Sequence, residues 1–254
     1  MFQAFMVVLR EGVEAFLIVA IIFAYLRKRG EKQLMNAVSW GVAASALASG
    51  LLGYALWITQ GASAPLWEGV FASVTVVLVT TLLIHMWKVG PHLKTEMEKG
   101  LSEAASKQTA SASYWGVFLF AVVSITREGM EMMLLLFQIQ EPHIVAGILL
   151  GVLGAAAIAL LWQQFGYLIN FRRFFQITAI YLLLFTFQIA FQAFHEFTEA
   201  GIFPHSEALH AWSEPYSTQG VYGKWYANIL FAGCAAWLLA SLLLESKSRK
   251  PALD

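Results

Sequence analysis

One charged motif occurs twice in an otherwise apolar sequence. The pattern R-E-G-x-E occupies residues 10–14 and again residues 127–131. In a helix, the two glutamates of each copy share a face because they are three residues apart. The arginine precedes the second glutamate by four residues, which is the spacing of an ion pair within a helix. One carboxylate of each copy can therefore be held by the arginine while the other faces a ligand.

Both copies lie inside long apolar runs, where charge is costly. Each charged residue near the centre of a membrane helix costs about 2.5–3.5 kcal/mol, so a chain that bears this cost twice is expected to use the charges. Carboxylate oxygens suit a hard metal cation. The candidate ligands are Glu11, Glu14, Glu128 and Glu131, with Arg10 and Arg127 as supporting ion-pair partners. The competing interpretation is a salt-bridge staple between helices, for which one acid per arginine would suffice.

A second group of candidate metal ligands lies near the end of a later apolar run. His195, Glu196 and Glu199 are spaced so that at least two of them face one way on a helix. Glu68 stands at the start of another apolar run, where it either joins the same entry site or reaches the membrane interface. The intervening outer loops carry further polar residues: Glu141, His143, His205, Glu207, His210 and Glu214. These either extend a vestibule that attracts a metal cation or are solvated loop residues without a role.

The composition is that of a polytopic membrane protein. Of 254 residues, 59% are hydrophobic and 13% are charged, and the mean hydropathy is +0.65. The net charge of zero argues against a nucleic-acid partner. The single cysteine, Cys234, excludes a disulfide framework and a thiolate metal cluster. The first apolar run ends in basic residues rather than a cleavage site, so we expect a retained span and not a signal peptide.

Seven windows are long enough to cross a bilayer as helices, which makes the predicted fold class all-α. They cover residues 3–25, 36–58, 65–88, 114–138, 143–168, 173–199 and 223–245. Lysine and arginine gather in alternate loops and in the tail, so the predicted N-terminus lies outside and the C-terminus in the cytoplasm. The chain then contacts membrane lipid over most of its length.

The position of the two motifs predicts an inverted repeat. Each motif opens a unit of three spans, and an odd number of crossings turns the second unit upside down relative to the first. The predicted permease domain covers residues 1–245, followed by a cytoplasmic tail at 246–254. Within it we expect repeat 1 at 1–88, a cytoplasmic linker at 89–113, repeat 2 at 114–199, an outer loop at 200–222 and a seventh span at 223–245. Glycine and alanine are dense in the second and fifth spans, which predicts close helix packing.

Taken together, these motifs resemble the oxidase-dependent iron permease family, especially its bacterial ferrous-iron-uptake branch. The resemblance runs from Phe2 to about Leu244 and is carried by the paired R-E-G-x-E motifs, the LWEG around Glu68 and the AFHE around His195. It implies iron uptake across the cytoplasmic (inner) membrane of a bacterium, with the motif glutamates as iron ligands. Iron is then the transported substrate, with no permanently bound cofactor. An extracytoplasmic ferroxidase or iron-binding protein is the implied partner, although the D-A-S-E-type motif of fungal members is not found.

The leading hypothesis is a permease, not an enzyme, that moves Fe³⁺ produced at the outer face through a glutamate-lined site near the membrane midplane. A permease for another cation, such as Pb²⁺ or Mn²⁺, would use the same residues. An intramembrane metalloenzyme is a third hypothesis, because His195-Glu196-x-x-Glu199 is similar to H-E-x-x-H. That motif lacks its second histidine here, and no third ligand is evident. A proton channel or scaffold that uses the acid–base network without metal is a fourth.

Overall fold

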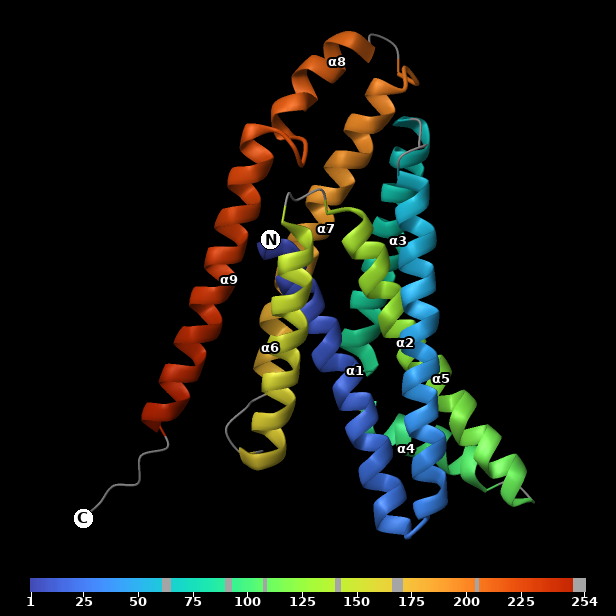
Figure 1. Cartoon of the computed structure of the whole chain (residues 1–254). Coiled ribbons are helices and arrows are strands. Elements are labelled where there is room, and N and C mark those ends of the chain that lie inside the picture. The colour runs from blue at the N-terminus through green and yellow to red at the C-terminus, as the bar shows by residue number, and fades with distance from the viewer. Residues whose placement is uncertain are drawn as a thin grey trace. The chain divides into compact units, whose positions relative to one another are not determined.

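The computed structural model describes residues 1–60, 65–89, 93–106, 109–139, 143–165, 171–203 and 206–248, and every regular element in these ranges is helical (Figure 1). The elements are α1 (Phe2–Arg29), α2 (Lys32–Gln60), α3 (Pro65–Val89), α4 (Leu93–Ala105), α5 (Ala110–Phe137), α6 (Ile144–Phe165), α7 (Phe171–Glu199), α8 (Ser206–Ser213), the 3₁₀ turn η2 (Glu214–Tyr216) and α9 (Val221–Ser248).

Each of the seven predicted apolar windows falls on one long helix, although the end of the 143–168 window lies outside the described residues. By length and composition, four of these helices can cross a membrane over their described residues. Their spans are Lys32–Leu56, Pro65–Ile84, Ile144–Leu161 and Arg173–Glu199. α1 and α5 are 28 residues long but carry the charged motifs. These features are those of a helical membrane protein, whereas seven crossings and their orientation stay predictions.

The helices form two compact units, and both motifs lie largely in one of them. This motif unit comprises Glu11–Ala62 and Thr81–Gln138, so it takes helices from both halves of the predicted repeat. In it, α2 packs closely along α5. A side chain at Gly41 would stand 2.8 Å from the Ala121 Cβ, and one at Gly53 would stand 2.7 Å from the Met133 sulfur. The small residues of the second span thus allow the close packing that the sequence predicts.

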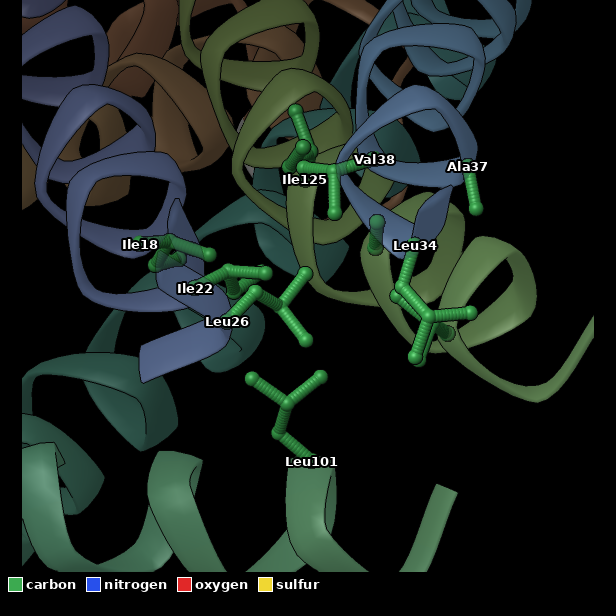
Figure 2. Close-up of a cluster of buried hydrophobic side chains, with 10 residues drawn as sticks. Ile18, Ile22, Leu26, Leu34, Ala37, Val38, Leu101 and Ile125 are labelled. Atoms are coloured by element: carbon green, nitrogen blue, oxygen red, sulfur yellow. The ribbon is translucent and has the colours of Figure 1, made fainter. Parts of the chain in front are cut away.

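A cluster of buried aliphatic side chains holds the motif unit together at one end (Figure 2). Ile18, Ile22 and Leu26 of α1 are four residues apart and therefore line one helix face. They belong to the same cluster as Leu101 of α4, which is fully buried and lies near Leu26 in Figure 2. The remaining members come from α2 and α5: Leu34, Ala37, Val38, Val117, Ala121 and Ile125. The polar linker predicted between the halves therefore contains a helix, α4, and one apolar face of this helix packs against α1.

The other unit comprises Met1–Arg10, Ser63–Thr80 and Ile139–Asp254. Its α6 presents glycines at positions 147, 151 and 154 to the first turns of α1. A Cβ at Gly151 would lie 2.7 Å from the Val8 Cβ, and one at Gly154 would lie 2.9 Å from the Leu9 side chain. Only glycine lets the two helices approach this closely, so the glycines of α6 fix how it seats on the start of α1.

Candidate metal centre

The helices α1 and α5 run uninterrupted through the two motifs and bury all their glutamates. Glu11 has no exposed surface, and none of Glu14, Glu128 and Glu131 exceeds 8% exposure. Buried carboxylates are stable only when paired, hydrogen-bonded or bound to a metal. Four of them in two helices form the largest concentration of buried acid among the described residues.

Three of these carboxylates come together in the motif unit. Glu11 of α1 and Glu128 and Glu131 of α5 each offer one ligand oxygen, and all three oxygens lie within 4.8 Å of one another. Carboxylates this close repel each other strongly when ionised in a buried place. A bound cation would relieve that repulsion. Glu14, one turn further along α1, is buried but is not a member of this group of three.

The two motif arginines have different surroundings. Arg127 Nε donates a hydrogen bond to Glu131 Oε1 at 3.1 Å, the i,i+4 pair that the motif spacing favours, and the Arg127 side chain remains 44% exposed. Arg10 is buried, with 3% exposure. Arg127 is therefore paired with a carboxylate of the group, whereas Arg10 is buried within the first motif.

The glycine of the second motif sets the spacing between α5 and α2. A Cβ at Gly129 would overlap the Ser49 hydroxyl and lie 2.7 Å from the Ser49 Cβ, closer than real side chains approach. Because Gly129 stands between the two α5 glutamates, this contact also fixes where their backbone lies. Glycine permits this approach because it has no Cβ, whereas nothing in the sequence identifies Ser49 as the neighbour.

A second group of potential ligands forms in the other unit. His195 and Glu199 of α7 and His210 of α8 each offer one ligand atom, and these atoms lie within 4.8 Å of one another. The two imidazole rings stack with centroids 4.6 Å apart and an interplanar angle of 19°. His195 is buried, His210 is half-buried and Glu199 is exposed. The structure thus joins His210, one of the loop residues whose role the sequence leaves open, to two predicted ligands.

Glu196 is not a member of this group and is hydrogen-bonded to a buried amide. Gln192 Nε2 donates to Glu196 Oε1, and Gln192 Oε1 accepts hydrogen bonds from the Thr218 backbone N–H and hydroxyl, each at 2.9 Å. A second amide, Gln188, donates to the Gly223 carbonyl at 3.2 Å. The candidate residues chosen from the sequence include neither amide, although the four-residue spacing of positions 188, 192 and 196 marks one polar helix face.

Glu68 lies in the first turn of α3, close to the same part of α7. Its neighbour Gly69 packs so tightly that a Cβ there would stand 3.3 Å from the Glu196 Cβ. Glu68 is partly buried and interacts electrostatically with Glu199. The predicted entry residues therefore share one neighbourhood within this unit.

The other outer-loop candidates that the structure describes belong to neither group of ligands. Glu207, Glu214 and His143 are exposed. Glu141 and His205 lie outside the described residues.

Comparison with known proteins matches this chain to the iron permease FTR1 family over residues 1–241. The chain belongs to the iron permease FTR1 family. The ferrous iron permease EfeU of Yersinia pestis is 30% identical over 218 residues, which cover 82% of this chain and 76% of that protein. EfeU of Escherichia coli O6:K15:H31 (strain 536) is 28% identical over 234 residues, or 88% of this chain and 83% of the relative. EfeU of Escherichia coli O6:H1 (strain CFT073) is 29% identical over 233 residues, with the same coverage.

No solved structure matches the chain. Membership of the iron permease FTR1 family confirms the resemblance found in the motifs and indicates a membrane transporter of iron rather than an enzyme. Family membership does not assign roles to single residues, so the metal-binding roles of the two groups are proposals.

Proposed function

We propose that this iron permease FTR1 family member carries iron inward across the cytoplasmic membrane through a carboxylate site formed by its two motifs. The observation that supports this most directly is the group of three buried carboxylates, Glu11, Glu128 and Glu131, whose oxygens lie within 4.8 Å of one another. Glu14 is the fourth candidate ligand, one turn away on α1. Arg10 and Arg127 offset surplus negative charge when the site is empty.

The donor set favours a hard cation. Carboxylate oxygens bind hard ions in preference to soft ones, and Fe³⁺ is harder than Fe²⁺. We therefore propose that iron crosses as Fe³⁺ after oxidation at the outer face, with an extracytoplasmic ferroxidase or iron-binding protein as the partner. The EfeU relatives are described as ferrous iron permeases, which fits a ferrous ion supplied outside and oxidised before it passes.

The proposed path follows from the predicted topology. Seven crossings, with the N-terminus outside and the C-terminus in the cytoplasm, place the motifs of α1 and α5 in two inverted repeats. In such transporters the site lies near the midplane and is exposed alternately to each side. The outer approach to it is formed by Glu68, His195, Glu196 and Glu199, which share one neighbourhood in the structure.

The test is radio-iron uptake into proteoliposomes that contain the purified protein, with and without an external ferroxidase. Wild type is compared with the Glu11→Gln/Glu128→Gln double variant, which removes two negative charges but keeps the side-chain shape. The matched control is Glu96→Gln, an exposed glutamate of α4 outside both groups. Insertion of every variant is checked by its elution as a single species in detergent.

Uptake that requires the oxidase, disappears in the double variant and persists in Glu96→Gln is the expected result. Full uptake by the double variant would refute the carboxylate site. Uptake without the oxidase would make Fe²⁺ the transported ion. Competition by Pb²⁺ or Mn²⁺ at equal concentration would show that the site serves other cations as well.

A further inference from the structure

We infer that His195, Glu199 and His210 form a second metal site, built for a divalent first-row transition metal such as ferrous iron. The site adds His210, and with it helix α8, to the proposed outer approach. It differs from the motif site in having two nitrogen donors and one oxygen donor. Its existence does not depend on transport through the motif glutamates, so the two proposals can fail separately.

The hydrogen bonds around His195 prepare its ring for a metal. Ser213 Oγ donates to the His210 carbonyl at 3.1 Å and lies 2.8 Å from His195 Nδ1. A hydroxyl has one hydrogen, so the assignment that satisfies both contacts makes His195 Nδ1 the donor to Ser213. Nε2 of the neutral ring then carries the free lone pair. A histidine that donates through one nitrogen and ligates through the other is the usual arrangement at metal sites.

The position of Ser213 indicates that this arrangement is held firmly. Ser213 is fully buried at the end of α8. The Thr198 hydroxyl donates to the His195 carbonyl at 2.7 Å, which anchors the backbone of the same histidine. Two neighbouring hydroxyls thus fix the ring and the backbone of one proposed ligand.

His210 supplies an independent sign that a ligand is expected. Its Nδ1 is buried, and within the described part of the chain it has no hydrogen-bond partner. A buried polar atom left in this state costs about 1–3 kcal/mol. The ring nevertheless stacks on His195 beside the Glu199 carboxylate. A cation bound by this cluster would offset that cost and stabilise the imidazole in this position.

The spacing of the three ligand atoms fits a transition metal after a small adjustment. With metal–nitrogen bonds of about 2.1 Å, neighbouring ligands in an octahedron lie about 3.0 Å apart and opposite ones about 4.2 Å apart. The three atoms lie within 4.8 Å of one another, so movements of about an ångström would bring them to these distances. One of the two stacked rings must also turn, because the lone pairs of parallel rings do not meet at one metal. Two histidines and one carboxylate with open positions form the donor set typical of non-haem Fe²⁺. Exposure of Glu199 leaves room for such open positions.

The experiment measures Co²⁺ and anaerobic Fe²⁺ binding to the full-length protein, purified without a histidine tag. Co²⁺ reports its ligands by visible absorption, and titration calorimetry gives the affinity. His210→Ala removes a proposed ligand. Ser213→Ala keeps all three ligands but removes the hydroxyl that is hydrogen-bonded to His195 Nδ1. His143→Ala, an exposed histidine outside the group, is the control.

We expect one Co²⁺ site with nitrogen ligation that His210→Ala weakens by 100-fold or more. Ser213→Ala should weaken it by about 10–100-fold, the usual effect of losing a partner behind a metal ligand. The His143→Ala variant should keep the Co²⁺ spectrum and affinity of wild type. Unchanged affinity in His210→Ala would overturn the inference. If His210→Ala does not fold, the Ser213→Ala affinity decides, and wild-type binding by that variant contradicts the site.

Discussion

Replacing Gly129 by alanine tests whether the contact between α5 and α2 positions the motif carboxylates. The new Cβ would overlap the Ser49 hydroxyl, and rotating that hydroxyl away does not help, because the two Cβ atoms would still be 2.7 Å apart. The helices must therefore separate or slide. Glu128 and Glu131 flank the substituted residue and would move with it.

The expected loss of stability follows from two opposing effects. Overpacking a close contact costs about 1–3 kcal/mol, and the contact here is at the severe end because both partners are backbone-anchored atoms. Alanine recovers about 0.5–1 kcal/mol of helix propensity relative to glycine. The net destabilisation of Gly129→Ala should then be about 2–2.5 kcal/mol. Iron uptake should fall further than stability alone explains, since two proposed ligands are displaced.

A graded rescue makes the reasoning specific. Adding Ser49→Ala removes the hydroxyl overlap but leaves the 2.7 Å approach between Cβ atoms, so it should restore only part of the loss. Adding Ser49→Gly removes both contacts and should bring stability to within about 0.5 kcal/mol of wild type, since the propensity changes at the two sites nearly cancel. Gly50→Ala is the control, because a Cβ there meets nothing within 4 Å.

Melting temperature in detergent and radio-iron uptake in proteoliposomes are measured on the same preparations. Both the melting temperature and the uptake should be highest in wild type. They should then decrease in the order Gly129→Ala/Ser49→Gly, Gly129→Ala/Ser49→Ala and Gly129→Ala. Coupling between residues in contact is typically 0.5–3 kcal/mol. A Gly129→Ala protein as stable as Gly50→Ala, or a Ser49→Gly substitution that gives no rescue, would refute the packing argument.

Two further predictions concern residues that hold the sites. Arg10→Ala should lower the melting temperature well below that of Arg127→Ala, because losing a buried charge costs far more than losing an exposed one. Arg10 is 3% exposed, whereas the Arg127 side chain is 44% exposed. Equal melting temperatures would contradict this prediction. Gln192→Leu should lower the free energy of unfolding by about 1–3 kcal/mol, because it leaves Glu196 and Thr218 without the amide that joins them. A denaturation series measures this change. An unchanged free energy of unfolding would show that the network does not contribute to stability.

The helices themselves could be predicted because their signal is local. Each apolar window falls on a helix, and the three-residue spacing in the motifs places their glutamates on shared faces. The motif residues could also be singled out, since charge within a long apolar run is costly and therefore informative. The number of membrane spans is less certain from the sequence than the helices are. Seven spans are predicted, whereas four of the described helices qualify by length and composition, and α1 and α5 with their charged motifs are not among these four.

The partners of the site residues could not be predicted, because they come from distant parts of the chain. Nothing in the spacing of positions 10–14 and 127–131 shows that Glu11 rather than Glu14 meets the α5 glutamates. That choice depends on the rotation of α1 about its axis, which packing at Ile18, Ile22 and Leu26 helps to set. Likewise, only the fold of α8 against α7 could bring His210 to His195.

The two proposed sites differ in charge, so oxidation of the iron changes how strongly each site binds it. Two imidazoles and one carboxylate carry a single negative charge, whereas the motif group brings three carboxylates together. Coulomb attraction scales with the product of the charges, so converting Fe²⁺ to Fe³⁺ raises the attraction to either site by about half. The four motif glutamates and two motif arginines carry a net charge of −2 against −1 at the histidine site, so the absolute gain is about twice as large at the motifs. If both sites bind as proposed, oxidation of iron therefore favours its binding at the motif glutamates over its binding at the histidine site.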